Sequence, residues 1–384
     1  MKIDMYAHIC PKKFMDAFSK RVTVWGKITR ADREVLGTFS TRRGVKGAEQ
    51  RSAPLPFWAD QGTAQPMLWD IDSRLEIMDK YEDYVQVLVP VAPPVGTFCS
   101  PEDAAYLASI FNDELAELTS KYPDKFVAAV AYLPLNNIDA TLKEIDRTIN
   151  ELGFKGIYLY TPIHELKKTG EQGYDYDYET MKPLDSPEFM PIYESMSRHK
   201  LPIWIHPWGE DGLPVYRGEE RAKYALSHVI GWPLESAMAM SRLVCSGILA
   251  KYPNLRFIIH HCGSGIIPAL AGRLEHSFDP FKMEGMKWGQ PGEADPFQIK
   301  PPIDYFRMFY ADTALYGDVP GLMCGHAFFG VQHILFGTDY PFDIEGGDKY
   351  IRLTIDAVHR MNVSDADKEM IFEGNAKRIL RLEI

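Results

Sequence analysis

Short apolar runs alternate with helix-like stretches along the whole chain, and this alternation limits the folds that are available. Eight runs rich in β-branched and aromatic residues predict strands beginning near residues 3, 85, 126, 156, 201, 255, 306 and 333. Between them, residues 103–123 and 139–153 carry apolar residues at helical spacing. Strand–helix repeats of this kind predict an α/β fold with a parallel sheet. A closed barrel and a doubly wound open sheet fit the periodicity equally well.

The chain length of 384 residues fits one α/β barrel with insertions as well as two smaller domains. Three stretches interrupt the strand–helix rhythm, near residues 20–66, 161–187 and 281–302. None of them has the apolar content to bury a core of its own, so we interpret them as loops inserted into one domain that spans residues 1–384.

Charge and cysteine usage exclude several classes of partner. The formal net charge is −11, whereas binding to nucleic acid or to an anionic membrane needs a concentrated basic patch. The five cysteines are odd in number and form no CxxC pair, which argues against a disulfide framework and a thiolate zinc cluster. The chain has no signal-peptide pattern and no apolar run of about 18 residues. We therefore expect a cytoplasmic protein without nucleic-acid or membrane partners.

Polar side chains follow several of the predicted strands, at the point where each strand ends. They are His8, His206, the pair His260 and His261, and Asp339. The carboxyl ends of barrel strands converge on one mouth, where active sites lie. A single residue of this kind is more often structural, but the joint pattern predicts a metal centre. Imidazole and carboxylate suit Zn, Mn, Fe or Co, and three protein ligands, here His8, His206 and Asp339, leave an open position for substrate or water.

The sequence resembles the amidohydrolase 2 family, which includes decarboxylases typified by aminocarboxymuconate-semialdehyde decarboxylase, and it also resembles the gamma-resorcylate type. The matching motifs are IDMYAHICP, LPIWIHPWG, YPNLRFIIHHCGSG and LFGTDYPF, which lie between Ile3 and Phe342. The resemblance implies a (β/α)8 TIM barrel of the metal-dependent hydrolase superfamily. It also implies one divalent metal ion, with Zn favoured and Mn next, and a homodimer.

The resemblance further implies roles for individual residues. In the family the first strand usually carries His-x-His or Glu-x-His, the fifth a His, the sixth a catalytic His before a Gly-rich turn, and the eighth an Asp. The matching positions here are His8, His206, His261 and Asp339. His261 is preferred to His260 as the catalytic residue because it directly precedes Cys-Gly-Ser-Gly. His260 is then expected to face inward or to contact the residues that hold the metal.

The sequence departs from the family at Tyr6, which stands where the first ligand is expected. A phenol with an ordinary pKa near 10 is a poor metal ligand, so Tyr6 donates a hydrogen bond to substrate, coordinates as phenolate or packs.

Three other residues are candidates for contacts to substrate or to the ligands. Trp208 could line an aromatic pocket or pack in the core. Arg273 could bind a second substrate carboxylate or form a solvated salt bridge. Asp312 ends the seventh strand and is expected to hydrogen-bond a ligand histidine.

The reaction that these parts favour is metal-dependent, non-oxidative decarboxylation of an aromatic or unsaturated carboxylic acid. Asp339 is then a metal ligand and a proton carrier, and His261 is an acid/base or a partner of the substrate carboxylate. The alternative is hydrolysis of a lactone or an amide by a metal-activated hydroxide, which uses nearly the same side chains. A third hypothesis, motivated by Tyr6, is a small-molecule-binding relative that has lost catalysis.

Overall fold

The computed structural model describes most of the chain. The ranges are 1–21, 66–163, 166–168, 174–176, 182–208, 226–263, 265–277, 289–290 and 295–384. The first predicted insertion, near residues 20–66, lies almost entirely outside these ranges, as does much of the third, near residues 281–302.

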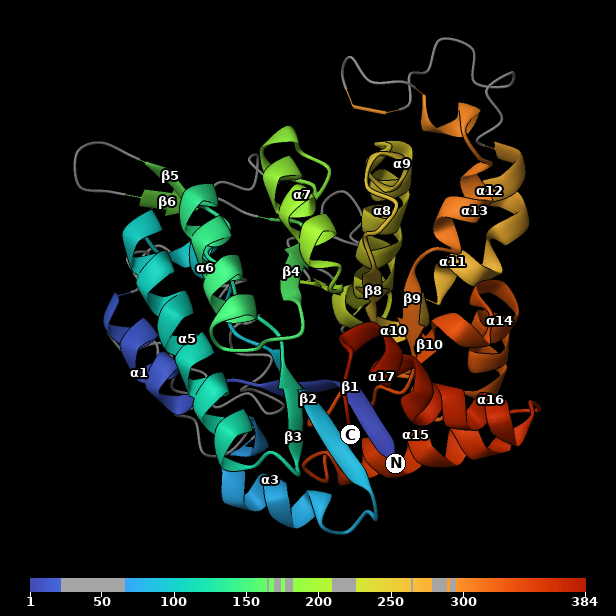
Figure 1. Cartoon of the computed structure of the whole chain (residues 1–384), viewed down its shortest axis with the longest axis horizontal. Helices are drawn as coiled ribbons and strands as arrows, with labels where there is room; N and C mark the ends of the chain where they lie inside the picture. The colour runs from blue at the N-terminus through green and yellow to red at the C-terminus, as the bar shows by residue number, and fades with distance from the viewer. Residues whose placement is uncertain are drawn as a thin grey trace.

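Parallel strands form the centre of the molecule (Figure 1). They are β1 (Lys2–Ile9), β2 (Tyr84–Pro90), β3 (Phe126–Ala129), β4 (Ile157–Thr161), β7 (Ile203–Pro207), β8 (Phe257–Ile259), β9 (Tyr310–Asp312) and β10 (Ile334–Leu335). Continuous ladders form two sheets, in the orders β1-β2-β3 and β10-β9-β8-β7-β4. Single parallel bridges join the sheets at both edges, from Ala7 to Tyr340 and from Ala131 to Ile157. The strands therefore follow the order of a (β/α)8 TIM barrel, and this fold prediction is confirmed.

Some strands are shorter than the sequence pattern predicts. The apolar run that begins near residue 306 forms a strand only at Tyr310–Asp312, because Pro302–Phe306 is a helix with proline in its first turn. β10 is also short. Beyond it, the Thr313 hydroxyl donates to the Gly337 carbonyl at 3.0 Å and accepts from the Gly337 amide at 3.0 Å. Side-chain hydrogen bonds thus replace ladder bonds where the chain turns toward the barrel mouth.

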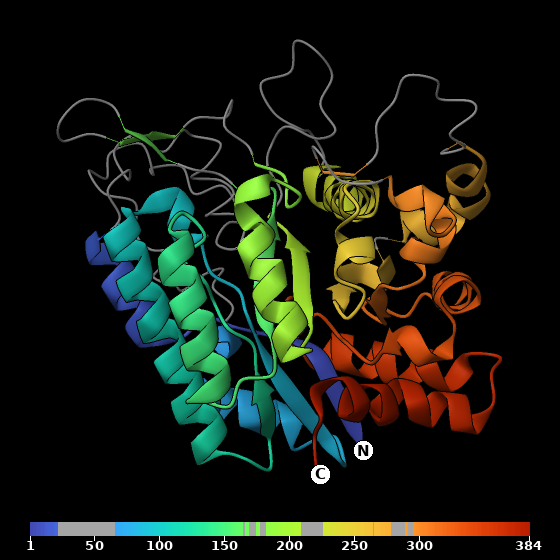
Figure 2. The same ribbon diagram turned by 45° about the horizontal axis from the view of Figure 1, so that its top comes forward.

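Helices lie outside the strands (Figures 1 and 2). They are α1 (Lys12–Arg21), α3 (Ile71–Met78), α4 (Val95–Phe98), α5 (Pro101–Lys121), α6 (Ile138–Asn150), α7 (Met190–His199), α8 (Trp232–Cys245), α9 (Ile248–Lys251), α10 (His260–Gly263), α11 (Ile266–Ala269), α12 (Ala271–Ser277), α13 (Pro302–Phe306), α14 (Val319–Phe329), α15 (Asp348–Arg360), α16 (Asp365–Glu369) and α17 (Asn375–Leu380). Both helices predicted from spacing are present as α5 and α6. No helix in the described ranges is long and apolar enough to cross a membrane.

Helix capping explains where α5 and α6 begin. The Ser100 hydroxyl accepts from the Asp103 amide at the start of α5, and the Asn137 side chain accepts from the Ala140 amide at the start of α6. The second predicted insertion contains a feature that the sequence pattern did not reveal, because β5 (Leu166–Lys168) and β6 (Tyr174–Tyr176) pair as antiparallel strands. Strands of three residues are too short to give a clear alternation.

Candidate metal and active site

Four histidines and two aspartates gather where the carboxyl ends of the strands meet. They are His8 in β1, His206 in β7, His260 and His261 directly after β8, Asp312 at the end of β9, and Asp339 after β10. All six are buried. Ligand atoms of His8, His206 and His260 lie within 4.8 Å of one another, as do those of His260, His261 and Asp339. The residues that the sequence predicted as metal ligands or catalytic groups therefore lie in one buried cluster, but the predicted ligands His8, His206 and Asp339 do not form a group by themselves, and His260 belongs to both groups.

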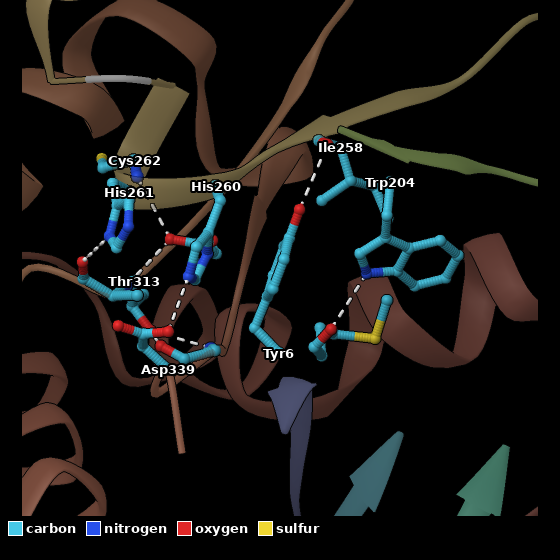
Figure 3. Close-up of polar contacts among 12 residues, drawn as sticks. Tyr6, Trp204, Ile258, His260, His261, Cys262, Thr313 and Asp339 are labelled. Atoms are coloured by element: carbon cyan, nitrogen blue, oxygen red, sulfur yellow. Dashed lines mark hydrogen bonds and ion pairs between the residues drawn. The ribbon is translucent and has the colours of Figure 1, made fainter. Parts of the chain in front are cut away.

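His260 is held between two carboxylates (Figure 3). Its Nδ1 donates to Asp312 Oδ2, and its Nε2 lies 3.1 Å from Asp339 Oδ1. The other oxygen of Asp312 accepts from the backbone amides of Cys262 at 3.1 Å and Ala314 at 2.9 Å. Burial lowers the pKa of His260, but the two aspartates outweigh burial and raise that pKa to about 9. Asp312 thus contacts a buried histidine of the site.

His206 and His261 each use Nδ1 to bind a backbone carbonyl. Nδ1 of His206 donates to the Pro207 oxygen at 2.5 Å, and Nδ1 of His261 donates to the Ala314 oxygen at 3.2 Å. With Nδ1 protonated, Nε2 of a neutral ring keeps its lone pair. Burial, reinforced by the nearby His260, lowers the pKa of His206 well below its ordinary value and that of His261 to about 4. Both rings are therefore neutral near pH 7 and have a free nitrogen for a metal ion or a proton.

His8 carries the strongest sign that the site suits an ion. The ring is fully buried, and neither of its nitrogens makes a well-aligned hydrogen bond in the described part of the chain, where Asp339 and the Pro90 backbone are its polar neighbours. Its Nε2 lies 3.3 Å from Asp339 Oδ1. Burial lowers the pKa of His8 and so favours the neutral ring that binds metals. Because a buried nitrogen without a partner points to an ion or water, these residues fit a divalent cation.

Asp339 uses both of its carboxylate oxygens. Its φ is 64°, in the left-handed region that residues other than glycine rarely adopt. Oδ1 faces His8 and His260, and Oδ2 accepts from the Tyr316 hydroxyl at 2.7 Å. Burial raises the pKa of Asp339, but the histidines, His260 above all, outweigh burial and hold the pKa well below its ordinary value. The side chain is therefore an ionised carboxylate, as a metal ligand must be.

Tyr6 turns its oxygen away from the histidine cluster (Figure 3). The phenol donates to the Ile205 carbonyl at 3.1 Å and lies 3.5 Å from the Ile258 carbonyl. The ring stacks on His260, with centroids 3.7 Å apart. Burial raises the pKa of Tyr6 well above its ordinary value, which disfavours the phenolate. Of the three roles that the sequence left open, this geometry corresponds to packing.

The other two residues that the sequence singled out for substrate lie in different environments. Trp208 is buried directly after β7, where its ring contacts Tyr160 edge to face at 5.2 Å. Trp232 makes a similar contact with the ring of His206 at 5.5 Å. Arg273 is exposed on α12. Aromatic side chains therefore flank the cluster, whereas Arg273 does not lie among its buried residues.

Two further buried polar groups support the strand ends that carry the cluster. Asp4 accepts from the hydroxyl of Tyr84, and from the amide and the hydroxyl of Thr338, the residue before Asp339. Arg74, from α3, donates from Nη1 to the carbonyl oxygen of His8 at 2.7 Å. Sequence reasoning missed these residues and Tyr316, because none of them lies at the carboxyl end of a predicted strand.

Comparison with known proteins places these observations in a family. A family model described as Amidohydrolase matches residues 3–382. The 2-amino-3-carboxymuconate-6-semialdehyde decarboxylase of Dictyostelium discoideum is 27% identical over 82% of this chain and 77% of that protein. The gamma-resorcylate decarboxylase of Rhizobium sp. (strain MTP-10005) is 28% identical over 86% of this chain and 92% of that protein.

Solved structures share the fold. The 2,6-dihydroxybenzoate decarboxylase from Rhizobium matches with a TM-score of 0.69 and 23% identity, over 99% of this chain and 98% of that one. The 5-carboxyvanillate decarboxylase from Novosphingobium aromaticivorans, complexed with manganese and a nitrobenzoic acid, matches with a TM-score of 0.76 and 21% identity, over 100% and 96% of the two chains. Because the family model covers nearly the whole sequence, this chain belongs to the Amidohydrolase family.

Proposed function

We propose that this protein is a metal-dependent, non-oxidative decarboxylase of an aromatic or unsaturated carboxylic acid. The observation that carries the proposal is the buried cluster at the strand ends, in which Nε2 atoms and a carboxylate oxygen converge. The relatives that match most of the chain are named decarboxylases of gamma-resorcylate and of an aminocarboxymuconate semialdehyde. These names favour decarboxylation over lactone or amide hydrolysis, and over a relative that has lost catalysis.

The metal in this proposal is one divalent ion held by His8, His206 and Asp339. Two imidazoles and one carboxylate suit Zn, which is our first choice. Mn comes next, because it is present in the solved 5-carboxyvanillate decarboxylase. The bound ion would supply a Lewis acid that stabilises negative charge on a substrate oxygen.

The side chains of the site supply the proton chemistry. In decarboxylation the bond between the substrate carbon and its carboxylate breaks, the electron pair stays on the substrate carbon, and a proton takes the place of the departing carbon dioxide. We assign Asp339 as the carrier of this proton, which its ionised carboxylate must first accept, and His261 as the acid/base or carboxylate partner beside it. Trp208 belongs to the aromatic wall of the substrate site. Tyr6 receives no direct substrate role because its hydroxyl is bound to backbone, and Arg273 receives none because it is exposed on α12.

The test is carbon dioxide release from a panel that includes 2,6-dihydroxybenzoate and 5-carboxyvanillate, with Zn-loaded and Mn-loaded protein. We expect release that depends on the metal and falls by about 100-fold or more in His261→Gln. His199→Gln, on α7 with Nε2 3.3 Å from Asp146 Oδ1, is the matched control and should keep the activity. Hydrolysis of lactones or amides by the same protein, without carbon dioxide release from any acid, would overturn the proposal and favour the hydrolase alternative.

We also propose that the chain is a cytoplasmic homodimer. Large apolar side chains are exposed on α8 and just before it, with Met238 at 57% and Val229 at 58% exposure, and Ile299, after the short helix Pro296–Gln298, is 66% exposed. Such surfaces often mark protein interfaces. All five cysteines are unpaired, which is typical of a reducing compartment. Light scattering after size exclusion should give twice the mass of one chain, and a monomer at micromolar concentration would contradict the dimer.

A further inference from the structure

The ring of His260 is fixed by contacts on several sides, and these contacts indicate a specific role for this residue. Its ring is fully buried, its Nδ1 is bound to Asp312, and one face stacks on Tyr6 with an interplanar angle of 19°. Tyr6 is fixed in turn by its bond to the Ile205 carbonyl. These contacts leave Nε2 as the only polar atom of the ring that faces the cluster (Figure 3).

We propose that His260 is a fourth protein ligand of the metal and takes the place of a donor that the first strand does not supply at Tyr6. The inference rests on the proposed function, because it concerns the same metal site. It adds a third imidazole to His8 and His206 and leaves Asp339 as the carboxylate donor.

The spacing of the donor atoms supports this assignment. Asp339 Oδ1 lies 3.1 Å from His260 Nε2 and 3.3 Å from His8 Nε2. With bonds of about 2.0–2.2 Å, donors of one zinc ion lie about 2.8–3.6 Å apart, from a right-angled to a tetrahedral arrangement. A five-coordinate ion holds four side chains and still keeps one position for substrate. The ligand atoms of His8, His206 and His260 also lie within 4.8 Å of one another. His260 belongs to both groups of converging ligand atoms, so an ion that it shares with His8 and His206 also lies beside Asp339.

The surroundings of His260 are those of a metal-binding histidine. Ligand histidines usually donate their second ring N–H to a carboxylate or a carbonyl, which fixes the tautomer and aims the other nitrogen at the ion. Asp312 provides this contact, and it is itself oriented by the amides of Cys262 and Ala314. Nε2 of His260 is protonated without the ion, because the two aspartates raise the pKa of the ring, so the metal would displace this proton. By contrast, the oxygen of Tyr6 is bound to backbone and faces away. The result is a set of three imidazoles and one carboxylate, which favours Zn and Co over Mn.

The first test uses Co-substituted full-length protein, because Co(II) binds zinc sites and reports on its ligands. Proton NMR of the wild type should show three strongly shifted, exchangeable imidazole N–H signals, from His8, His206 and His260. Two signals would overturn the inference. This count does not depend on whether any variant folds.

The second test compares variants by metal affinity and by the visible spectrum of bound Co(II). His260→Gln should bind Zn at least about 10-fold more weakly and change the spectrum, and Asp312→Asn should weaken binding by about 10- to 100-fold. His199→Gln serves as the control and should match the wild type. If His260→Gln keeps the wild-type affinity and spectrum while His206→Gln loses the metal, His260 is not a ligand, but the proposed function stands. If the wild type itself binds no metal, both fail.

Discussion

Replacing the buried Arg74 by methionine should lower both the free energy of unfolding and the affinity of the site for metal. Arg74 is fully buried on α3, and its guanidinium donates at 2.7 Å both to the His8 carbonyl and to Gln86 Oε1. It also lies 4.6 Å from the centre of the Tyr340 ring. Methionine fills similar space but donates no hydrogen bond, so these two buried acceptors lose this partner, as does the part-buried Met67 carbonyl, which Nη1 contacts at 3.3 Å.

The magnitude follows from those two acceptors. Each buried polar group left without a partner costs about 1–3 kcal/mol, which gives about 2–6 kcal/mol in all. Part of this loss is offset, because the variant no longer has to bury a charged guanidinium. Burial is also the reason that the pKa of Arg74 is lowered. We therefore expect the free energy of unfolding to fall by about 2–4 kcal/mol.

Urea unfolding of the metal-free protein measures this change. Arg352→Met is the matched control, because the Arg352 side chain is 56% exposed and its ion pair is with Glu345 on the surface. Its effect should stay within about 0.5 kcal/mol. The Arg74 variant should also bind metal more weakly, since the end of β1 that carries His8 loses its support. A destabilisation no larger than that of the control would refute the reasoning.

Three other predictions concern the site and its surroundings. Tyr316→Phe removes the hydrogen bond to Asp339 Oδ2, which contributes about 1.5–3 kcal/mol. We therefore expect kcat to fall by about 10-fold or more with little change in KM. An unchanged kcat would show that this contact does not orient the Asp339 carboxylate. Gly347→Ala should lower the free energy of unfolding by more than about 2 kcal/mol, because φ is +102° and the new Cβ would lie 2.0 Å from Tyr340 Cε2. The control is Gly272→Ala, where no atom lies within 4 Å of the added Cβ, so its stability should change little. Equal urea midpoints for the two variants would contradict the steric explanation for Gly347. Chelation should lower the melting temperature and added Zn should restore it, since the metal binds the folded state; equal melting curves would argue against a resident ion.

Much of the barrel could be predicted because its parallel strands are continuous apolar runs. His206 and Asp339 could be assigned to the site for the same reason, since each follows such a run at its carboxyl end. The two adjacent histidines could not be resolved in this way. Neighbours on a regular strand point to opposite faces, but β8 ends at Ile259 and His261 takes a φ of 54°, so both rings lie in the site with centroids 3.9 Å apart.

Other supporting residues carry no signal in the sequence. Tyr316 comes from the connection after β9, and it reaches Asp339 only because of the way that this segment turns, with a φ of 52° at Tyr316 itself. Arg74 looks like an ordinary charged position of a helix, yet it is fully buried. Such contacts depend on tertiary packing, which the periodicity of apolar residues does not encode.

The most direct test of the central claim is elemental analysis of the purified protein beside its His206→Ala and Asp339→Ala variants. The account predicts about one equivalent of Zn or Mn per chain in the parent and its loss in both variants, each of which should remain folded by circular dichroism. A parent protein that holds no transition metal, and takes up none when Zn or Mn is added, would contradict the assignment of a metal centre to the strand ends.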